Sequence, residues 1–83
     1  MDVAIYPNPS EGNFTIAVNS NDKTAVAEIE IVNEYGQPVY KTTMKNNNGV
    51  MVLNVNNKLT NGIYLVNCIL NNQKMIKKLV INK

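Results

Sequence analysis

The residues that could perform acid–base chemistry in this chain are few and scattered. The 83-residue sequence contains no histidine, the side chain that most often exchanges protons near neutral pH. Its six carboxylates include one close pair, Glu28 and Glu30, which would share one face of a strand. Such a pair could in principle act as acid and base, but at this spacing carboxylates more often keep an exposed face soluble. The sequence therefore predicts that the chain is not an enzyme.

Side chains that attack carbonyl groups or bind metals are equally sparse. The single cysteine, Cys68, lies in an apolar run without a histidine to activate it, which predicts a small core residue and excludes an intramolecular disulfide. Zinc sites need Cys or His clusters, and calcium sites need converging oxygens such as an Asp-x-Asp pattern, which the sequence lacks. The glycines stand alone and form no phosphate-binding loop. We expect no catalytic residue, no metal site and no cofactor.

Charge and hydropathy restrict the possible partners. The formal net charge is +2, and all eight basic residues are lysines. Arginine dominates the recognition of bases and phosphates, so its absence argues against nucleic acid as a partner. No apolar stretch approaches the roughly 18 residues of a membrane-spanning helix, and we see neither a transmembrane segment nor a signal peptide. Weak attraction to an anionic surface remains open.

The alternation of apolar and polar residues predicts a chain of short strands. Seven strands separated by turn residues are typical of an immunoglobulin-like, all-β sandwich with antiparallel strands. A small closed barrel is the alternative fold, and composition alone would also allow a helix at 25–32. Clustered asparagines at 46–48, 56–57 and 71–72 predict loop tips. The expected strands are 3–6, 14–19, 24–32, 38–44, 50–55, 63–70 and 75–81.

The same alternation predicts which side chains form the core. In the strand 63–70 both faces are apolar, which favours a central position in a sheet. Pro38 cannot donate a backbone hydrogen bond, so it should begin a strand or lie in an edge strand. Tyr64 should lie in the core with its hydroxyl on a backbone partner, whereas Tyr35 should be exposed in a turn. The expected inward residues are Phe14, Ile16, Val18, Ala27, Ile29, Ile31, Leu53 and Val55.

Four segments, in this order and spacing, resemble the type IX secretion C-terminal sorting domain. They are the opening 6–16 with its Pro-Asn-Pro loop, the central hairpin 29–40, the Gly-x-Tyr strand 59–66 and the basic, apolar end 77–83. Together they cover essentially the whole chain. The sequence departs from the family in having Asn33-Glu34 before the central turn and in lacking arginine. The recognition candidates in these segments are Pro7, Asn8, Pro9, Gly12, Gly36, Gly62, Tyr64, Lys77 and Lys78.

The resemblance implies a secretion signal at the extreme C-terminus of a larger exported protein. Residues 1–83 would form a single domain cut from that protein, with Met1 an added start. The parent would reach the periplasm through its own signal peptide, and the type IX outer-membrane translocon would recognise the folded domain. The cargo would then arrive at the cell surface or in the medium. A cell-surface sortase would remove the domain by a cut upstream of it and could join the cargo to anionic lipopolysaccharide.

Several alternatives stay open at this point. Lys77 and Lys78 could contact the secretion machinery or an anionic lipid, or they could protect an edge strand from aggregation. The segment 7–9 could be a rigid recognition loop or simply the end of a strand. The main alternative function is an immunoglobulin- or fibronectin-like module that binds glycan or protein beside an extracellular enzyme. Exposed aromatic residues on one sheet face would favour that module, and a third possibility is a passive spacer.

Overall fold

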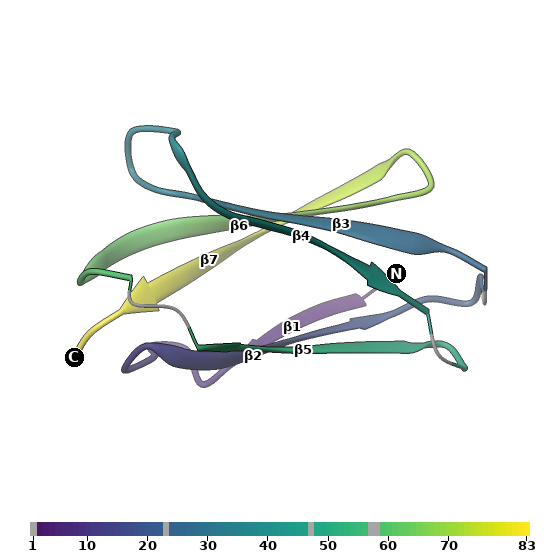
Figure 1. The fold of residues 1–83 in the computed structure, drawn as a ribbon, viewed down its shortest axis with the longest axis horizontal. Helices are drawn as coiled ribbons and strands as arrows, with labels where there is room; N and C mark the ends of the chain where they lie inside the picture. Colours follow the sequence, from purple (N-terminus) through teal and green to yellow (C-terminus); the bar gives the residue numbers. More distant parts are fainter. Residues whose placement is uncertain (1, 23, 47, 57–58) are drawn as a thin grey trace.

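Two antiparallel sheets face each other across one hydrophobic core (Figure 1). The structure is a computed structural model that describes residues 2–22, 24–46, 48–56 and 59–83. The smaller sheet has the order β1-β2-β5, with β1 at Asp2–Tyr6, β2 at Asn13–Asn19 and β5 at Val50–Asn56. The larger sheet has the order β4-β3-β6-β7, with β4 at Pro38–Lys45, β3 at Val26–Val32, β6 at Gly62–Leu70 and β7 at Gln73–Ile81.

The strand order confirms the sandwich. Strands 1, 2 and 5 share one sheet and strands 3, 6 and 7 the other, as in immunoglobulin-like sandwiches, and β4 is added beside β3. All seven expected strands are present, with ends shifted by at most two residues. The barrel alternative is wrong because the two sheets are separate, and the helix alternative for 25–32 is wrong because β3 occupies this segment.

The core is formed by the facing sides of the two sheets. In the smaller sheet, Ile16 and Val18 of β2 are fully buried, and Phe14 is nearly so. In the larger sheet, Ile29 lies opposite Cys68 and Ile31 opposite Val66, and all four side chains are inaccessible to solvent. The expected inward residues are therefore confirmed, except that Leu53 is only partly buried at the margin of the core.

Strand β6 is central in its sheet, as its sequence predicts, but only one of its apolar faces is covered. Tyr64, Val66 and Cys68 point into the core. On the other face Ile63, Leu65 and Ile69 remain 45%, 42% and 38% exposed. The strand is therefore central in its sheet, but its second apolar face is not buried. Pro38 begins the edge strand β4, which satisfies both parts of its prediction.

The predicted turns are also present, except that Asn56, expected at a loop tip, is the last residue of β5. Asn48, Asn71 and Asn72 adopt positive φ angles, which asparagine tolerates better than most residues. The corresponding expectations for Asn47 and Asn57, like that for Met1, lie outside the described residues. Because consecutive strands run in opposite directions, the connections alternate between two ends of the molecule (Figure 1).

We call one of these ends the C-terminal pole: residues 7–12, 33–37, 59–61 and 82–83. Its four segments lie at the left of Figure 1, where the chain ends. The other end, which we call the opposite pole, holds the start of β1 and the connections that follow β2, β4 and β6. Three of the four segments that carry the family resemblance therefore have their turns at the C-terminal pole.

Candidate functional site

The loop that follows β1 is docked on the last strand. Asn8 donates a hydrogen bond from Nδ2 to the carbonyl oxygen of Lys78 at 2.7 Å, and its Oδ1 accepts one from the Val80 amide at 3.0 Å. Ser10 continues this pairing: its amide donates to Val80, and its carbonyl accepts from the Asn82 amide, both at 2.8 Å. The segment 7–9 thus does more than end β1, because it fastens the end of β7 to the smaller sheet.

Ser10 and Gly12 give this loop its shape. Ser10 is 1% exposed, and its hydroxyl donates to the Asn13 carbonyl at 2.8 Å while accepting from the Gly12 amide at 3.0 Å. Gly12 has a φ of 124°, a conformation that residues with a side chain rarely adopt. Sequence reasoning identified Gly12 and missed Ser10, because a serine between a proline and a glutamate gives no sign that it is buried.

The turn between β3 and β4 is organised by Asn33. Its Oδ1 accepts hydrogen bonds from the amides of Tyr35 and Gln37, both at 2.9 Å. Gly36 occupies the turn with a φ of 79°, and its amide donates to the Asn33 carbonyl at 3.0 Å. This confirms the predicted turn at Gly36 and leaves Tyr35 86% exposed at its tip.

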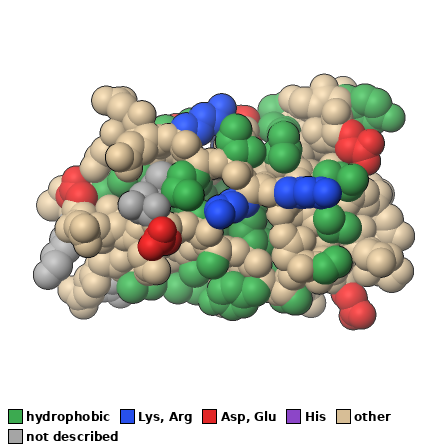
Figure 2. Space-filling view, turned by 180° about the vertical axis from the view of Figure 1, so that it is seen from behind, with side chains coloured by type: hydrophobic (Ala, Val, Ile, Leu, Met, Phe, Trp, Pro, Cys, Tyr) green, Lys and Arg blue, Asp and Glu red, His purple; other side chains and the backbone are tan. Residues whose placement is uncertain are grey.

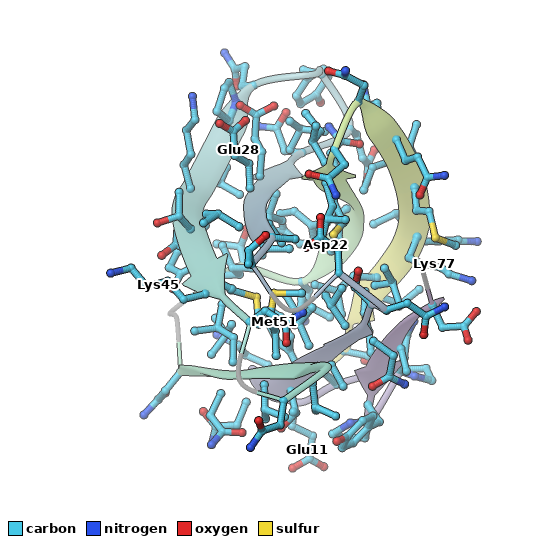
Figure 3. The ribbon with its side chains drawn as sticks, turned by 90° about the vertical axis from the view of Figure 1, so that its right-hand side faces the viewer. Glu11, Asp22, Glu28, Lys45, Met51 and Lys77 are labelled. Carbon is cyan, nitrogen blue, oxygen red and sulfur yellow. The ribbon has the colours of Figure 1, made fainter. Side chains whose placement is uncertain are left out.

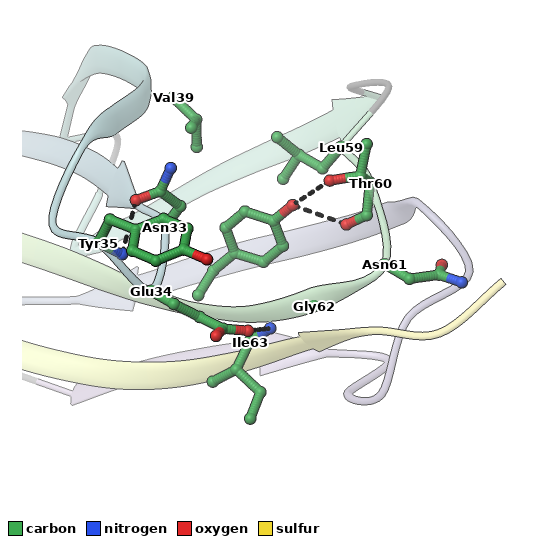
Figure 4. A pocket seen from close by; sticks show the side chains of 10 residues that line it. Asn33, Glu34, Tyr35, Val39, Leu59, Thr60, Asn61, Gly62 and Ile63 are labelled. Carbon is green, nitrogen blue, oxygen red and sulfur yellow. Dashed lines mark hydrogen bonds between the residues drawn. The ribbon is translucent and has the colours of Figure 1, made fainter.

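The segment before β6 is tied to this turn and to the chain end. The Ile63 amide donates to Oε1 of Glu34 at 3.4 Å, and the Lys83 amide donates to Oδ1 of Asn61 at 3.0 Å. Tyr64 is 5% exposed and donates its hydroxyl hydrogen to the Thr60 carbonyl at 2.6 Å, as predicted for a core tyrosine (Figure 4). The segments 7–12 and 59–61 are therefore bonded to the chain end at 82–83, and the turn 33–37 is bonded to the start of β6.

A pocket of about 420 Å³ lies between the β3–β4 turn and the segment before β6. Its lining residues include Tyr64, and Figure 4 labels Glu34 and Val39 on opposite sides of the pocket. The pocket brings together residues from two of the resembling segments, 29–40 and 59–66. Gly36 and the Pro-Asn-Pro loop are not among the residues that line it.

A family model for the secretion system C-terminal sorting domain matches residues 4–82. The chain belongs to this family. Its members are the C-terminal sorting signals of type IX secretion, which direct export to the cell surface or the medium, and a sorting signal of this kind is not in general a catalyst. A search of curated proteins found no match to the chain.

The two candidate lysines of the sorting domain point to opposite faces of the larger sheet. Lys77 pairs with the fully buried Val66, so it lies on the core side, whereas Lys78 pairs with the exposed Leu65 on the outer side. Both lysines are exposed, because β7 is an edge strand. Figure 2 shows lysine and hydrophobic side chains along the edge formed by β7 and β1, and Figure 3 labels Lys77 there. Because the two side chains point to opposite faces of the sheet, a flat partner surface that lies on one face could contact only one of them.

Two titratable groups of the sorting domain, Cys68 and Asp22, have shifted pKa values. Burial raises the pKa of the Cys68 thiol, so this thiol stays protonated at neutral pH. At the opposite pole, hydrogen bonds from Thr24 and from the Asn71 side chain lower the pKa of Asp22 (Figure 3). Within the described ranges, no three His, Cys, Asp or Glu side chains are placed to hold a metal. The described residues also include no helix that could cross a membrane.

Proposed function

We propose that the type IX translocon recognises this sorting domain at its C-terminal pole. The observation that carries the proposal is the set of hydrogen bonds that joins the segments of this pole to one another and to the adjoining ends of β6 and β7. Asn8 and Ser10 bind the end of β7, Glu34 binds Ile63, and Asn61 binds Lys83. A partner that binds this pole would contact several segments that are far apart in the sequence, and only the folded domain brings these segments together.

The direction of the chain supports this assignment. Asp2 pairs with Asn19 and lies at the opposite pole, whereas Lys83 lies at the C-terminal pole. We propose that residues 1–83 form one domain at the end of a larger secreted protein. The cargo would then be attached to the domain at the opposite pole, and the C-terminal pole would stay accessible to the translocon.

We also propose the events before and after recognition that the family resemblance implies. The parent protein crosses the periplasm before it meets the translocon, and a cell-surface sortase then cuts upstream of the domain. The sortase can join the released cargo to anionic lipopolysaccharide. The domain has no catalytic role and takes no cofactor, which agrees with the single, buried thiol and the scattered carboxylates.

The alternative role as a glycan-binding module receives less support. It would need several exposed aromatic residues on one sheet face. The two most exposed tyrosines are separated instead: Tyr6 ends β1 in the smaller sheet, and Tyr35 lies in a turn of the larger one. They form no common platform.

Export of a reporter tests the proposal. Residues 2–83 are fused to the C-terminus of a folded fluorescent protein that carries an N-terminal export signal. The fusion is expressed in a host with type IX secretion and in the same host without the translocon. We expect fluorescence at the surface or in the medium only with the translocon. Fluorescence that stays in the periplasm of both hosts, with a folded domain, would refute the sorting role.

Matched surface variants locate the recognised pole. Tyr35→Ser combined with Glu11→Gln alters two exposed residues of the C-terminal pole, and Val50→Ser combined with Lys45→Gln alters two exposed residues towards the opposite pole. Circular dichroism establishes that both variants fold. We expect export to fall for the first pair only; an equal effect of both pairs, or an effect of the second alone, contradicts recognition at the C-terminal pole.

A further inference from the structure

We propose that the pocket at the C-terminal pole binds a lysine side chain of the partner protein. The inference rests on the proposed function, because it names the chemistry by which the recognised pole would hold its partner. It concerns the cavity bounded by Glu34, Tyr35, Val39, Leu59 and Tyr64, which we call the Glu34 pocket.

Gly62 lines the Glu34 pocket and places no side chain in it. A β-carbon placed on Gly62 would find two side-chain atoms as its nearest neighbours, Glu34 Oε1 at 3.6 Å and Tyr64 Cε1 at 3.9 Å. The space that glycine leaves free is therefore bounded by a carboxylate on one side and by an aromatic ring on the other (Figure 4). Because Gly62 and Tyr64 are two residues apart on one strand, they share a face, which explains the Gly-x-Tyr spacing.

The carboxylate of Glu34 can accept a further partner. Its Oε1 accepts one long hydrogen bond, from Ile63 at 3.4 Å, and a carboxylate offers about four acceptor positions. Among the described residues that line the pocket there is no Lys or Arg. The pocket therefore favours a positively charged group, and it would repel an acidic side chain.

The remaining walls suit the stem of a lysine. Val39 and Leu59 supply aliphatic surface, and long basic side chains pack their methylene groups on such surface. The exposed Tyr35 supplies an aromatic ring, which attracts an ammonium group over its face, whereas the buried Tyr64 only borders the pocket. The volume of about 420 Å³ falls in the range of small-ligand pockets, about 300 to 1,000 Å³, so one side chain with its hydration fits.

Carbodiimide cross-linking tests the contact in the presence of the translocon. The reagent activates a carboxylate, and an amine in direct contact then attacks it, so that an amide bond forms and the reagent leaves as a urea. Outer membranes that contain the translocon are mixed with the purified domain. We expect an adduct that disappears with Glu34→Gln and after acetylation of the lysines in the membranes. Glu28→Gln, which removes an exposed carboxylate of β3 outside the C-terminal pole, should keep it.

Binding to the isolated domain provides a second, direct measurement. N-acetyl-lysine N-methylamide is titrated against the labelled domain at constant ionic strength, with N-acetyl-norleucine N-methylamide as the uncharged control. We expect amide shifts at Glu34, Tyr35 and Gly62 with the lysine probe only. Glu34→Gln should weaken binding about threefold to fivefold, as for removal of an exposed ion pair.

Three results would overturn the inference. One is an adduct that persists in Glu34→Gln. Another is an equal response to the norleucine probe. The third is wild-type export of the reporter by Glu34→Gln when this variant no longer responds to lysine. Each of them leaves the sorting role intact, because that role is decided separately by export with and without the translocon.

Discussion

At the scale of single residues, Asn8 joins two ends of the sequence. Its amide group donates to one backbone atom of β7 and accepts from another, and only an amide side chain of this length can do both. The sequence could not reveal this, because the partners lie 70 and 72 residues away. Pro-Asn-Pro indicated only that the strand ends. Local patterns report on turns, whereas long-range hydrogen bonds depend on the assembled fold.

Replacing Asn8 should therefore loosen the C-terminal pole. We expect Asn8→Ala to destabilise the domain by about 1 kcal/mol, since two partly solvated hydrogen bonds are lost. For a domain of this size this corresponds to a fall of about 5 °C in melting temperature. Asn19→Ala, at an exposed position of β2, is the matched control. Equal melting temperatures for the two variants would show that the Asn8 contacts contribute nothing.

The buried thiol of Cys68 gives a second prediction at this scale. Its raised pKa means that the folded domain disfavours the thiolate, so the protonated thiol contributes to the stability of the fold. This contribution is fully present below the unfolded pKa of about 9 and is lost as the pH rises through the pKa of the folded state. We expect slow alkylation by iodoacetamide in the native protein and rapid alkylation in denaturant. Native Cys68 that reacts as fast as the denatured residue would contradict its burial.

At the scale of elements, β7 is an exposed edge that is closed only at its end. The loop 8–10 forms hydrogen bonds with β7 from Lys78 onwards. The part of β7 before Lys78 has no such partner in the loop and contains Lys74 and Lys77. Lys77 projects on the core-facing side, where a charge hinders a second sheet from docking. The period of two along a strand already predicts that Lys77 and Lys78 face opposite ways; the sequence alone does not tell that β7 is an edge.

Removing these charges should promote association. We expect the double variant Lys77→Thr and Lys78→Thr to keep its fold and to form dimers or larger species, because an unprotected edge can pair with another chain. Sedimentation velocity measures this. Lys41→Thr with Lys45→Thr on the other edge strand, β4, shows whether the effect belongs to β7. A monomeric β7 variant would mean that the lysines are not edge protection.

The carboxylate of Asp22 accepts hydrogen bonds from two loops of the opposite pole. The hydrogen bonds of Asp22 lower its pKa below 3.8, so its contribution to stability is present above that value and is lost as the pH falls through the folded pKa. We expect the melting temperature of the wild type to fall more steeply below pH 4 than that of Asp22→Asn. Parallel curves would show that these bonds do not stabilise the fold.

At the scale of the whole molecule, one thin core supports both poles. The period-two pattern was sufficient to predict the seven strands and seven of the eight residues named as inward, because burial on one face imposes that period. It was not sufficient for the Glu34 pocket, which forms only when two segments about 29 residues apart meet. Glu34 in particular looked like an ordinary turn residue, and no local signal pairs it with Gly62.

The amount of exported reporter should therefore decrease when substitutions in this core destabilise the fold. Ile29 is fully buried, and Ile29→Ala should cost about 2 to 5 kcal/mol, a large share of the roughly 4 to 12 kcal/mol expected for a domain of this length. Ile29→Val should cost only about 1 kcal/mol. We expect reporter export to be nearly normal with valine and strongly reduced with alanine. Full export by an unfolded alanine variant would show that the translocon reads a linear segment.

The chain end at the C-terminal pole has a consequence for proteolysis. The Asn82 amide is bonded to Ser10, and the Lys83 amide to Asn61, so the last residues belong to the fold. A carboxypeptidase needs a free, extended end, and here that end becomes available only when the pole frays. An isolated domain of residues 2–83 should therefore resist trimming by a carboxypeptidase. For the same reason an epitope tag belongs before Asp2, because residues appended after Lys83 would crowd the contacts that hold the pole together.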